Sequence, residues 1–179
     1  MSEQRVEKIS YAKTVYGQKE IDAVVECLSE STQMGRHSID FEAAIADLFA
    51  KKYGLYVNSG SSALHLGVEA FDFPPGSEVI TPALTFGTTV ACIIKNNLIP
   101  AFVDVEPLSY CIDVDQIERM ISEKTVAIMA PDLLGNICDW VRIREIADKY
   151  DLIVIQDSAD TLGASLMGVS AGQFSDMSI

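Results

Sequence analysis

The chain has 179 residues, of which 49% are hydrophobic and 22% charged, and its formal net charge at pH 7 is -13. This composition is typical of one globular domain with a hydrophobic core and excludes an intrinsically disordered chain. The acidic charge argues against nucleic acid or an anionic membrane as a partner, because a phosphate-binding face needs clustered Lys and Arg. A small anionic ligand is compatible with it, since a helix N-terminus binds phosphate without net positive charge.

No apolar stretch is long enough to span a bilayer, and residues 1–10 lack the apolar core of a signal peptide. The four cysteines are widely spaced without a C-x-x-C pair, and Cys27 and Cys92 lie in apolar helical patterns. We therefore expect buried free thiols in a cytoplasmic protein, with no iron–sulfur cluster. Two isolated histidines predict no metal site.

The first part of the chain has mostly helical patterns. Apolar residues recur at helical spacing over 17–31 and over 39–54, and Gly54 stands where a C-terminal stop belongs. A short strand is expected over 55–58, followed by a turn and a helix over 63–71.

From residue 74 onward, strands and helices alternate. Strands are expected within 74–82, 99–105, 125–131 and 152–157, and helices over 85–96, 113–122 and 140–150. Asp113 opens the second of these helices with Gln116 three residues later, as in a capping box. The strands are short, β-branched and apolar on both faces, which is typical of a parallel sheet covered by helices on both sides. We predict a doubly wound α/β fold with a mostly parallel sheet.

Ligands of such sheets bind at the carboxyl ends of the strands, so the residues directly after each strand are the candidates. After the strand expected at 55–58, Gly60 would allow a sharp turn, and Ser61 and Ser62 would open a helix. Backbone N–H groups and two hydroxyls there form an anion site suited to a phosphate monoester. An ordinary serine N-cap explains the same residues. The segment matches neither a P-loop nor the G-x-G-x-x-G fingerprint.

Phe86 follows the next strand and a Pro-containing turn, which places it near the ligand edge of the sheet. An aromatic ring in that place stacks well on a flat ligand. A core phenylalanine at the start of a helix fits the same pattern, so both interpretations stay open for Phe86 alone.

The apolar run 152–155 is followed by Gln156 and then by Asp157, so a carboxylate lies at the edge of the core. An N-cap, a Walker B magnesium ligand, a ribose-binding acid and the partner of a protonated heterocycle are the alternatives. A Walker B acid would need a P-loop and a ribose-binding acid would need a glycine-rich loop, and the sequence has neither. A buried carboxylate needs a cationic or multi-donor partner, and a pyridinium nitrogen is one. A phosphate site at Ser61 and Ser62, an aromatic ring at Phe86 and an acid at Asp157 that pairs with a pyridinium nitrogen have one joint explanation. They would together form a site for pyridoxal 5'-phosphate (PLP).

Seven segments also match a known family in order and approximate spacing. They are "MGRHSIDFE", "VNSGSSALHLGV", "PPGSEVITPALTFGTTV", "NNLIPAFVDVEP", "YCIDVDQIE", "KTVAIMAPDLLGN" and "VIQDSADTLGA". By these segments the chain resembles the DegT/StrS-type enzymes, fold-type-I PLP enzymes that act on nucleotide-linked keto sugars. The resemblance implies that 1–179 is an incomplete large cofactor-binding domain, without the segment that binds the cofactor covalently and without the small C-terminal domain.

The resemblance also implies roles for five residues. Ser61 and Ser62 would bind the cofactor phosphate, Phe86 would stack on its ring, and Asp157 would pair with the pyridine nitrogen. Asp160 stands where many family members carry Gln next to the phenolic oxygen of the cofactor, so an acid there departs from the family pattern.

The lysine that the family uses to bind PLP would follow Ile179. Lysines such as Lys95, Lys124 and Lys149 match no such position, so the resemblance implies no transamination by this chain alone. A subgroup, the 4-keto-6-deoxyhexose 3-dehydratases, uses the amine form of the cofactor (PMP) and has a histidine in place of the lysine. "SGSSA", "FGTTV", "NNLIPAFVDV", "YCIDV" and "LLGN" are similar to that subgroup.

Three functions are therefore open. The first is the N-terminal part of an aminotransferase that moves an amino group from an amino-acid donor to a keto sugar nucleotide, in deoxyaminosugar, lipopolysaccharide or O-antigen biosynthesis. The second is a PMP-dependent 3-dehydratase, and the third is a non-catalytic remnant of either. A generic dinucleotide binder lacks its glycine fingerprint. The family resemblance implies a homodimer.

Overall fold

The computed structural model describes residues 13–30 and 32–179. Residues 1–10, on which the expectation of no signal peptide depends, and Ser31, the last residue of the first expected helix, lie outside the described residues. The chain divides into two compact units, Met1–His37 and Ser38–Ile179. Every candidate site residue belongs to the second unit.

The first unit contains α1 (Gln18–Glu30), as the helical pattern predicts. None of the thirteen residues of α1 is buried, and its apolar positions other than the half-buried Cys27 are exposed. The next helix, α2 (Arg36–Leu48), is shorter than the predicted 39–54. The prediction that Gly54 ends this helix is wrong: a Cβ on Gly54 would lie 2.4 Å from the Glu42 carbonyl oxygen, so glycine is needed there for a close backbone approach to α2.

The predicted strand over 55–58 is also wrong, because these residues form no strand in the described structure. The Tyr56 N–H donates instead to Glu42 Oε1 at 2.8 Å, and the Leu55 side chain is 80% exposed. An apolar run becomes a strand only where a sheet neighbour pairs with its backbone.

The second unit is built around a five-stranded sheet in which every paired neighbour is parallel, in the order β2-β1-β3-β4-β7. Its strands are β1 (Glu78–Pro82), β2 (Ile99–Val103), β3 (Thr125–Pro131), β4 (Ile153–Asp157) and β7 (Met177–Ser178). Its remaining helices are α3 (Gly60–Ala70), α4 (Gly87–Lys95), α5 (Val114–Met120) and α6 (Trp140–Tyr150). Short pieces complete it, namely the 3-10 turns η1 (Leu133–Gly135) and η2 (Ala171–Phe174) and the hairpin β5 (Ser165–Leu166) and β6 (Val169–Ser170).

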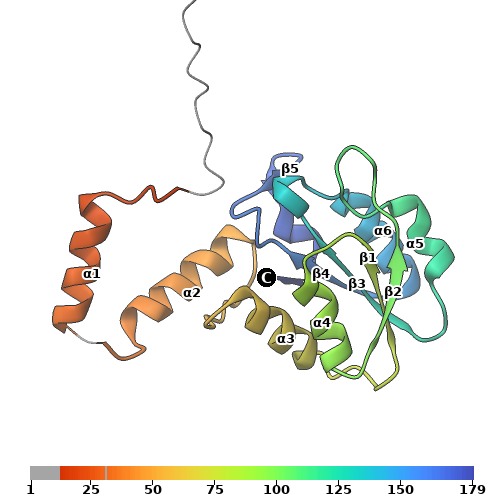
Figure 1. The fold of residues 1–179 in the computed structure, drawn as a ribbon, viewed down its shortest axis with the longest axis horizontal. Coiled ribbons are helices and arrows are strands. Elements are labelled where there is room, and N and C mark those ends of the chain that lie inside the picture. The colour runs from red at the N-terminus through yellow and green to blue at the C-terminus, as the bar shows by residue number, and fades with distance from the viewer. Residues whose placement is uncertain (1–12, 31) are drawn as a thin grey trace, which may run out of the picture. The chain divides into compact units, whose positions relative to one another are not determined.

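Helices cover both faces of this sheet, which confirms the predicted fold class (Figure 1). Alternate residues of β1 show the two faces: Val79 packs with α3 and α4, and Ile80 packs with α5 and α6. In the same way Ile155 of β4 faces α3 and α4, whereas Val154 faces α5 and α6. Strands that are apolar on both faces are therefore buried on both.

Two further sequence expectations concern single residues. Asp113 caps α5, accepting from Asp115 N at 3.1 Å and from Gln116 Nε2 at 2.6 Å, so the capping interaction is made through the carboxylate of Asp113. Cys92 is buried with its thiol free, as predicted, whereas Cys27 is only half-buried. No helix in the described part of the chain is long and apolar enough to span a bilayer.

Candidate cofactor site

Phe86 follows β1, and Asp157 and Asp160 lie at and after the end of β4, so these three candidates are at the carboxyl ends of strands on either side of β3. Ser61 and Ser62 lie instead at the start of α3, which precedes β1 in the chain. The connection from β1 leads through α4 to β2 on one side, and the chain then returns to β3 on the other side of β1. The strand order therefore reverses between β1 and β3, which is where open α/β sheets bind ligands.

Asp157 is the last residue of β4 and is 5% exposed. Its side chain follows the same face of the sheet as Ile155, toward α4. Its Oδ2 accepts from Thr89 Oγ1 at 2.9 Å, and its Oδ1 accepts from Ala159 N at 3.3 Å. An ionised carboxylate accepts about four hydrogen bonds, so two donors leave acceptor capacity at Asp157.

Burial raises the pKa of Asp157, and the hydrogen bonds from Thr89 and Ala159 oppose this shift only in part. The negative charges of Asp160 and Asp132 raise the pKa further. No Lys, Arg or His in the part of the chain that the structure describes forms an ion pair with Asp157. A buried acid without a cation, at a strand end, is suited to a cationic ligand.

Thr89 lies in the stretch that follows the strand predicted over 74–82, but the sequence alone assigns it no role. It lies on α4 and is completely buried, and its hydroxyl bonds to Asp157. A signal was present, because Thr89, Cys92 and Ile93 share one helical face, and a hydroxyl in an apolar stripe must find a partner.

Ser59, and not Ser61 or Ser62, caps α3. The Ser62 N–H donates to Ser59 Oγ at 3.2 Å, and the Ser59 hydroxyl donates to Ser62 Oγ at 3.1 Å. Gly60 is the first helical residue, and its φ is not positive, so the expectation of a sharp turn that needs glycine is wrong there. A Cβ on Gly60 would meet nothing within 4 Å, so this helix start is open to a ligand. Ser61 is exposed beside it.

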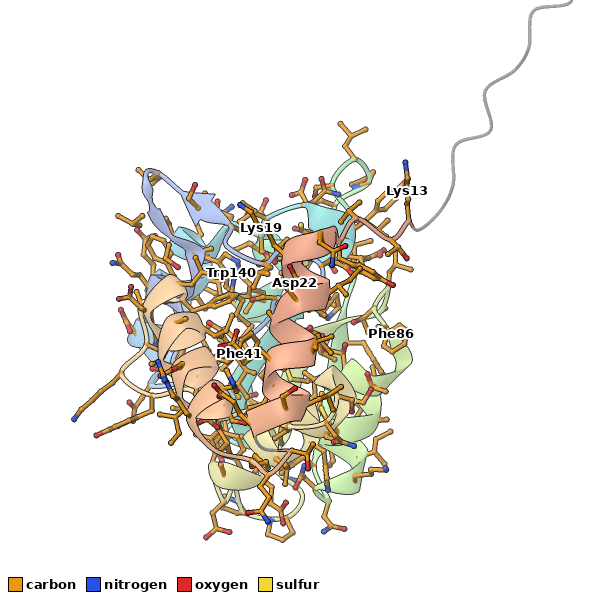
Figure 2. The ribbon with its side chains drawn as sticks, turned by 90° about the vertical axis from the view of Figure 1, so that its left-hand side faces the viewer. Lys13, Lys19, Asp22, Phe41, Phe86 and Trp140 are labelled. Atoms are coloured by element: carbon orange, nitrogen blue, oxygen red, sulfur yellow. The ribbon has the colours of Figure 1, made fainter. Side chains whose placement is uncertain are left out.

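Phe86 is the N-cap residue of α4 and is 67% exposed. Figure 2 shows it at the start of this helix, on the outside of the chain. It is therefore not a core residue, and a face of its ring is available to a ligand. Phe86 caps α4 and Thr89 lies in its first turn, so this helix links the ring to the carboxylate of Asp157.

Asp160 is exposed, and its Oδ2 accepts from Leu134 N at 2.9 Å. Leu134 and Gly135 both have positive φ, 56° and 85°, in the turn η1 after β3. Asp160 thus fixes a turn as well as lying close enough to raise the pKa of Asp157. The hydrogen bonds of the described residues link Asp157 and Asp160 to their neighbours, but join neither to Ser61 or Ser62.

Asp132 directly follows the strand predicted over 125–131, but the sequence alone assigns it no role. It follows β3, is 1% exposed, and accepts hydrogen bonds from Gln156 and from the Trp140 indole, among others. Its backbone N–H donates to the Asp157 carbonyl oxygen at 2.9 Å. An acid directly after a buried strand was the available signal.

The donor set fits a phosphate-bearing, cationic heteroaromatic ring. Three buried hydroxyl oxygens near this edge, those of Thr81, Thr85 and Ser158, have no hydrogen-bond partner among the residues that the structure describes. Unsatisfied buried hydroxyls are rare in native proteins and mark places where a ligand or water bonds. Within the described residues, no group of three or more His, Cys, Asp or Glu has an arrangement that would hold a metal ion.

Comparison with known proteins identifies relatives of the whole described fold. The model of the DegT/DnrJ/EryC1/StrS aminotransferase family matches residues 15–179. GDP-perosamine synthase of Caulobacter vibrioides is 35% identical over 171 residues, which are 94% of this chain and 46% of the relative. Lipopolysaccharide biosynthesis protein RfbH of Salmonella typhimurium is 40% identical over 172 residues, 91% of this chain and 39% of the relative.

Among solved structures, the E. coli GDP-4-keto-6-deoxy-D-mannose-3-dehydratase with bound hydrated PLP superposes with a TM-score of 0.83 at 28% identity. The match covers 88% of this chain and 42% of the dehydratase. The chain therefore spans less than half the length of the relatives it matches.

Proposed function

Because the chain belongs to the DegT/DnrJ/EryC1/StrS aminotransferase family, we propose that it is the N-terminal part of a PLP-dependent aminotransferase acting on a keto sugar nucleotide. The observation that carries this proposal is Asp157, a buried carboxylate with a raised pKa and spare acceptor capacity at a strand end. Relatives named for GDP-perosamine synthesis and lipopolysaccharide biosynthesis support the substrate class.

Four groups of this chain would hold the cofactor. Asp157 would accept from the protonated pyridine nitrogen, with its carboxylate oriented by the buried Thr89 hydroxyl. The open start of α3 at Gly60 and Ser61, together with Ser62, would bind the phosphate. The exposed ring of Phe86 would stack on the cofactor ring. We propose Asp160, whose carboxylate holds η1, as a neighbour of the phenolic oxygen.

Bound PLP, or its PMP form, supplies an electron sink for proton transfer at the amine-bearing carbon. Asp157 would keep the pyridine nitrogen protonated, because an ionised carboxylate favours the cationic form of a neighbouring ring. Burial at the end of β4 would keep water from competing for that carboxylate. The amino-acid donor and the sugar nucleotide belong to the complete enzyme, for which we propose a cytoplasmic homodimer.

The second candidate is a PMP-dependent 4-keto-6-deoxyhexose 3-dehydratase. The structural match to the E. coli 3-dehydratase supports it, as does 34% identity to GDP-4-keto-6-deoxy-D-mannose 3-dehydratase of Yersinia pseudotuberculosis. In either candidate the cofactor would lie at the same edge of the sheet, so the described residues suit both.

Product analysis separates these candidates. The protein that contains this chain is incubated with PLP, glutamate and GDP-4-keto-6-deoxy-D-mannose, and the sugar nucleotides are resolved by mass spectrometry. An amino sugar nucleotide supports the aminotransferase, and loss of the C3 hydroxyl supports the dehydratase. Unchanged substrate in a preparation that binds PLP would contradict both.

A further inference from the structure

We propose that Asp132 is a positioning residue that fixes the post-β4 loop, residues 158–164, and thereby sets the placement of Asp157 and Asp160 at the cofactor edge. This inference rests on the proposed function for its consequence, but its structural part concerns this chain alone. Asp132 lies directly after β3, and the post-β4 loop directly follows Asp157.

The carboxylate of Asp132 accepts four hydrogen bonds. Oδ1 accepts from Cys138 N and from Trp140 Nε1, both at 2.9 Å. Oδ2 accepts from Gln156 Nε2 at 2.7 Å and from Thr161 Oγ1 at 3.3 Å. No Lys, Arg or His in the described ranges bonds to it, so these four donors alone offset the burial of a charge.

The four donors come from three separate segments. Cys138 lies just before α6 and Trp140 begins it, Gln156 belongs to β4, and Thr161 belongs to the post-β4 loop. Gln156 and Thr161 bond to the same oxygen and lie on either side of Asp157 and Asp160 in the chain. A single buried carboxylate therefore holds the segment that carries both candidate acids at its two ends.

In two further hydrogen bonds the segment after β3 is the donor, and Asp157 and Asp160 are the acceptors. The Asp132 N–H donates to the carbonyl oxygen of Asp157, and the Leu134 N–H donates to Asp160 Oδ2, both at 2.9 Å. Residues 132–134 thus contact Asp157 through backbone and Asp160 through its side chain. Such a shell of fixed partners is what holds a binding group in a productive geometry.

Asp132 also acts on Asp157 through its charge. Burial is the main reason that the pKa of Asp157 is raised, and the charges of Asp160 and Asp132 add to it. The other titratable group beside Asp157 is Cys92 of α4, whose own pKa is raised mainly by burial and further by Asp157. Removal of the charge of Asp132 should therefore lower the pKa of Asp157, whereas removal of one hydrogen bond to the post-β4 loop should not.

Two variants separate the hydrogen bonds from the charge. Thr161→Val removes one bond to the post-β4 loop and keeps the charge of Asp132. Asp132→Asn keeps the size of the side chain, removes the charge and mismatches the donors from Gln156 and Thr161. Asp113→Asn is the matched control, since Asp113 caps α5 and also accepts two hydrogen bonds, outside this network.

Native-state hydrogen exchange and carboxyl NMR titration of the 179-residue chain provide the test. We expect T161V and D132N to raise exchange at the amides of 159–163 by about tenfold, the factor for one buried hydrogen bond, with α3 unaffected. We expect D132N, and not T161V, to lower the pKa of Asp157. Unchanged loop exchange in T161V, an equal effect of D113N, or an unchanged pKa in D132N would overturn the inference.

Titration of the same variants with PLP tests whether the post-β4 loop affects cofactor affinity. T161V and D132N should each weaken PLP binding by about tenfold if the loop places Asp157 for the ring. Wild-type affinity in a variant whose loop exchange has risen would overturn the positioning role. A wild-type chain that binds no PLP would contradict the proposed function, while the exchange and pKa measurements would still decide the structural part.

Discussion

The Thr89 hydroxyl donates a hydrogen bond to Asp157 Oδ2 at 2.9 Å, and both side chains are buried where α4 meets the end of β4. This contact joins a helix that begins with an exposed Phe86 to a strand that ends in an acid. It explains how an apolar strand carries a carboxylate at its last position: the charge is held by a hydroxyl from the covering helix and keeps acceptor capacity for a ligand.

Thr89→Val should destabilise the chain and weaken PLP binding. Valine has nearly the same shape but leaves Asp157 without its buried hydroxyl donor, and the pKa of Asp157 should rise, because that hydrogen bond lowers it. The expected loss in the free energy of unfolding at pH 7 is about 1–3 kcal/mol, measured by urea denaturation. Thr88→Val, one position earlier on α4, is the control and should change stability by less than about 0.5 kcal/mol. Equal effects of the two variants would contradict the role of Thr89.

Gly60→Ala should separate folding from phosphate binding. The added Cβ meets nothing within 4 Å, and φ at Gly60 is not positive, so stability should stay the same or rise by about 0.4–1 kcal/mol. If the cofactor phosphate lies against the start of α3, the same methyl group should weaken PLP binding by about tenfold, equal to about 1.4 kcal/mol. Thermal unfolding and a PLP titration measure the two effects. Unchanged affinity for PLP would contradict the placement of the cofactor phosphate at the start of α3.

The pKa of Asp157 should fall when PLP binds. In the free chain burial raises this pKa, so the native state holds the proton more strongly than the unfolded chain, where Asp has a pKa of about 3.9. The stability contributed by this group is therefore present below that value and is lost as pH rises through the raised native pKa. A cationic ring beside Asp157 favours the ionised form and reverses the shift. Carboxyl NMR titration, with Asp157→Asn to assign the resonance, tests this; an unchanged pKa would contradict a pyridinium partner.

Cys92 should be unreactive toward thiol reagents in the native chain. Burial raises its pKa to about 12, and the nearby charge of Asp157 contributes to the shift. Relative to an ordinary thiol, this lowers the thiolate fraction at pH 8 by about a thousandfold. Mass spectrometry after brief alkylation should show Cys92 unmodified until denaturant is added. Rapid native labelling of Cys92 would show that α4 opens from the sheet.

Local sequence patterns were sufficient for most of the second unit. The strand over 125–131 and the helix over 140–150 have the bounds that the patterns predict. The errors lie where structure depends on distant partners: residues 55–58 have strand composition but no sheet neighbour, and β7, with two residues, is too short to have a pattern. Gly54 is glycine because of its approach to Glu42, which no local rule reveals.

The candidate site was predictable only in part, because some of its residues depend on distant partners. Asp157 ends a predicted strand and Phe86 follows another strand after a short turn, and this needs only the chain order. Thr89 and Asp132 also follow predicted strands, but their roles depend on which elements are neighbours. Only the sheet order, with β3 beside β4, brings Asp132 to Gln156.

A PLP titration of the chain and its Asp157→Asn variant tests the central claim most directly. The control is Asp151→Asn, an exposed position in left-handed conformation that asparagine adopts readily. The wild type and D151N should show one saturable absorbance change, whereas D157N should bind at least about tenfold more weakly while being as stable or more stable at pH 7, because no buried charge remains. Saturable binding of equal affinity in D157N, or no binding by a folded wild-type chain, would contradict a cofactor site at the end of β4.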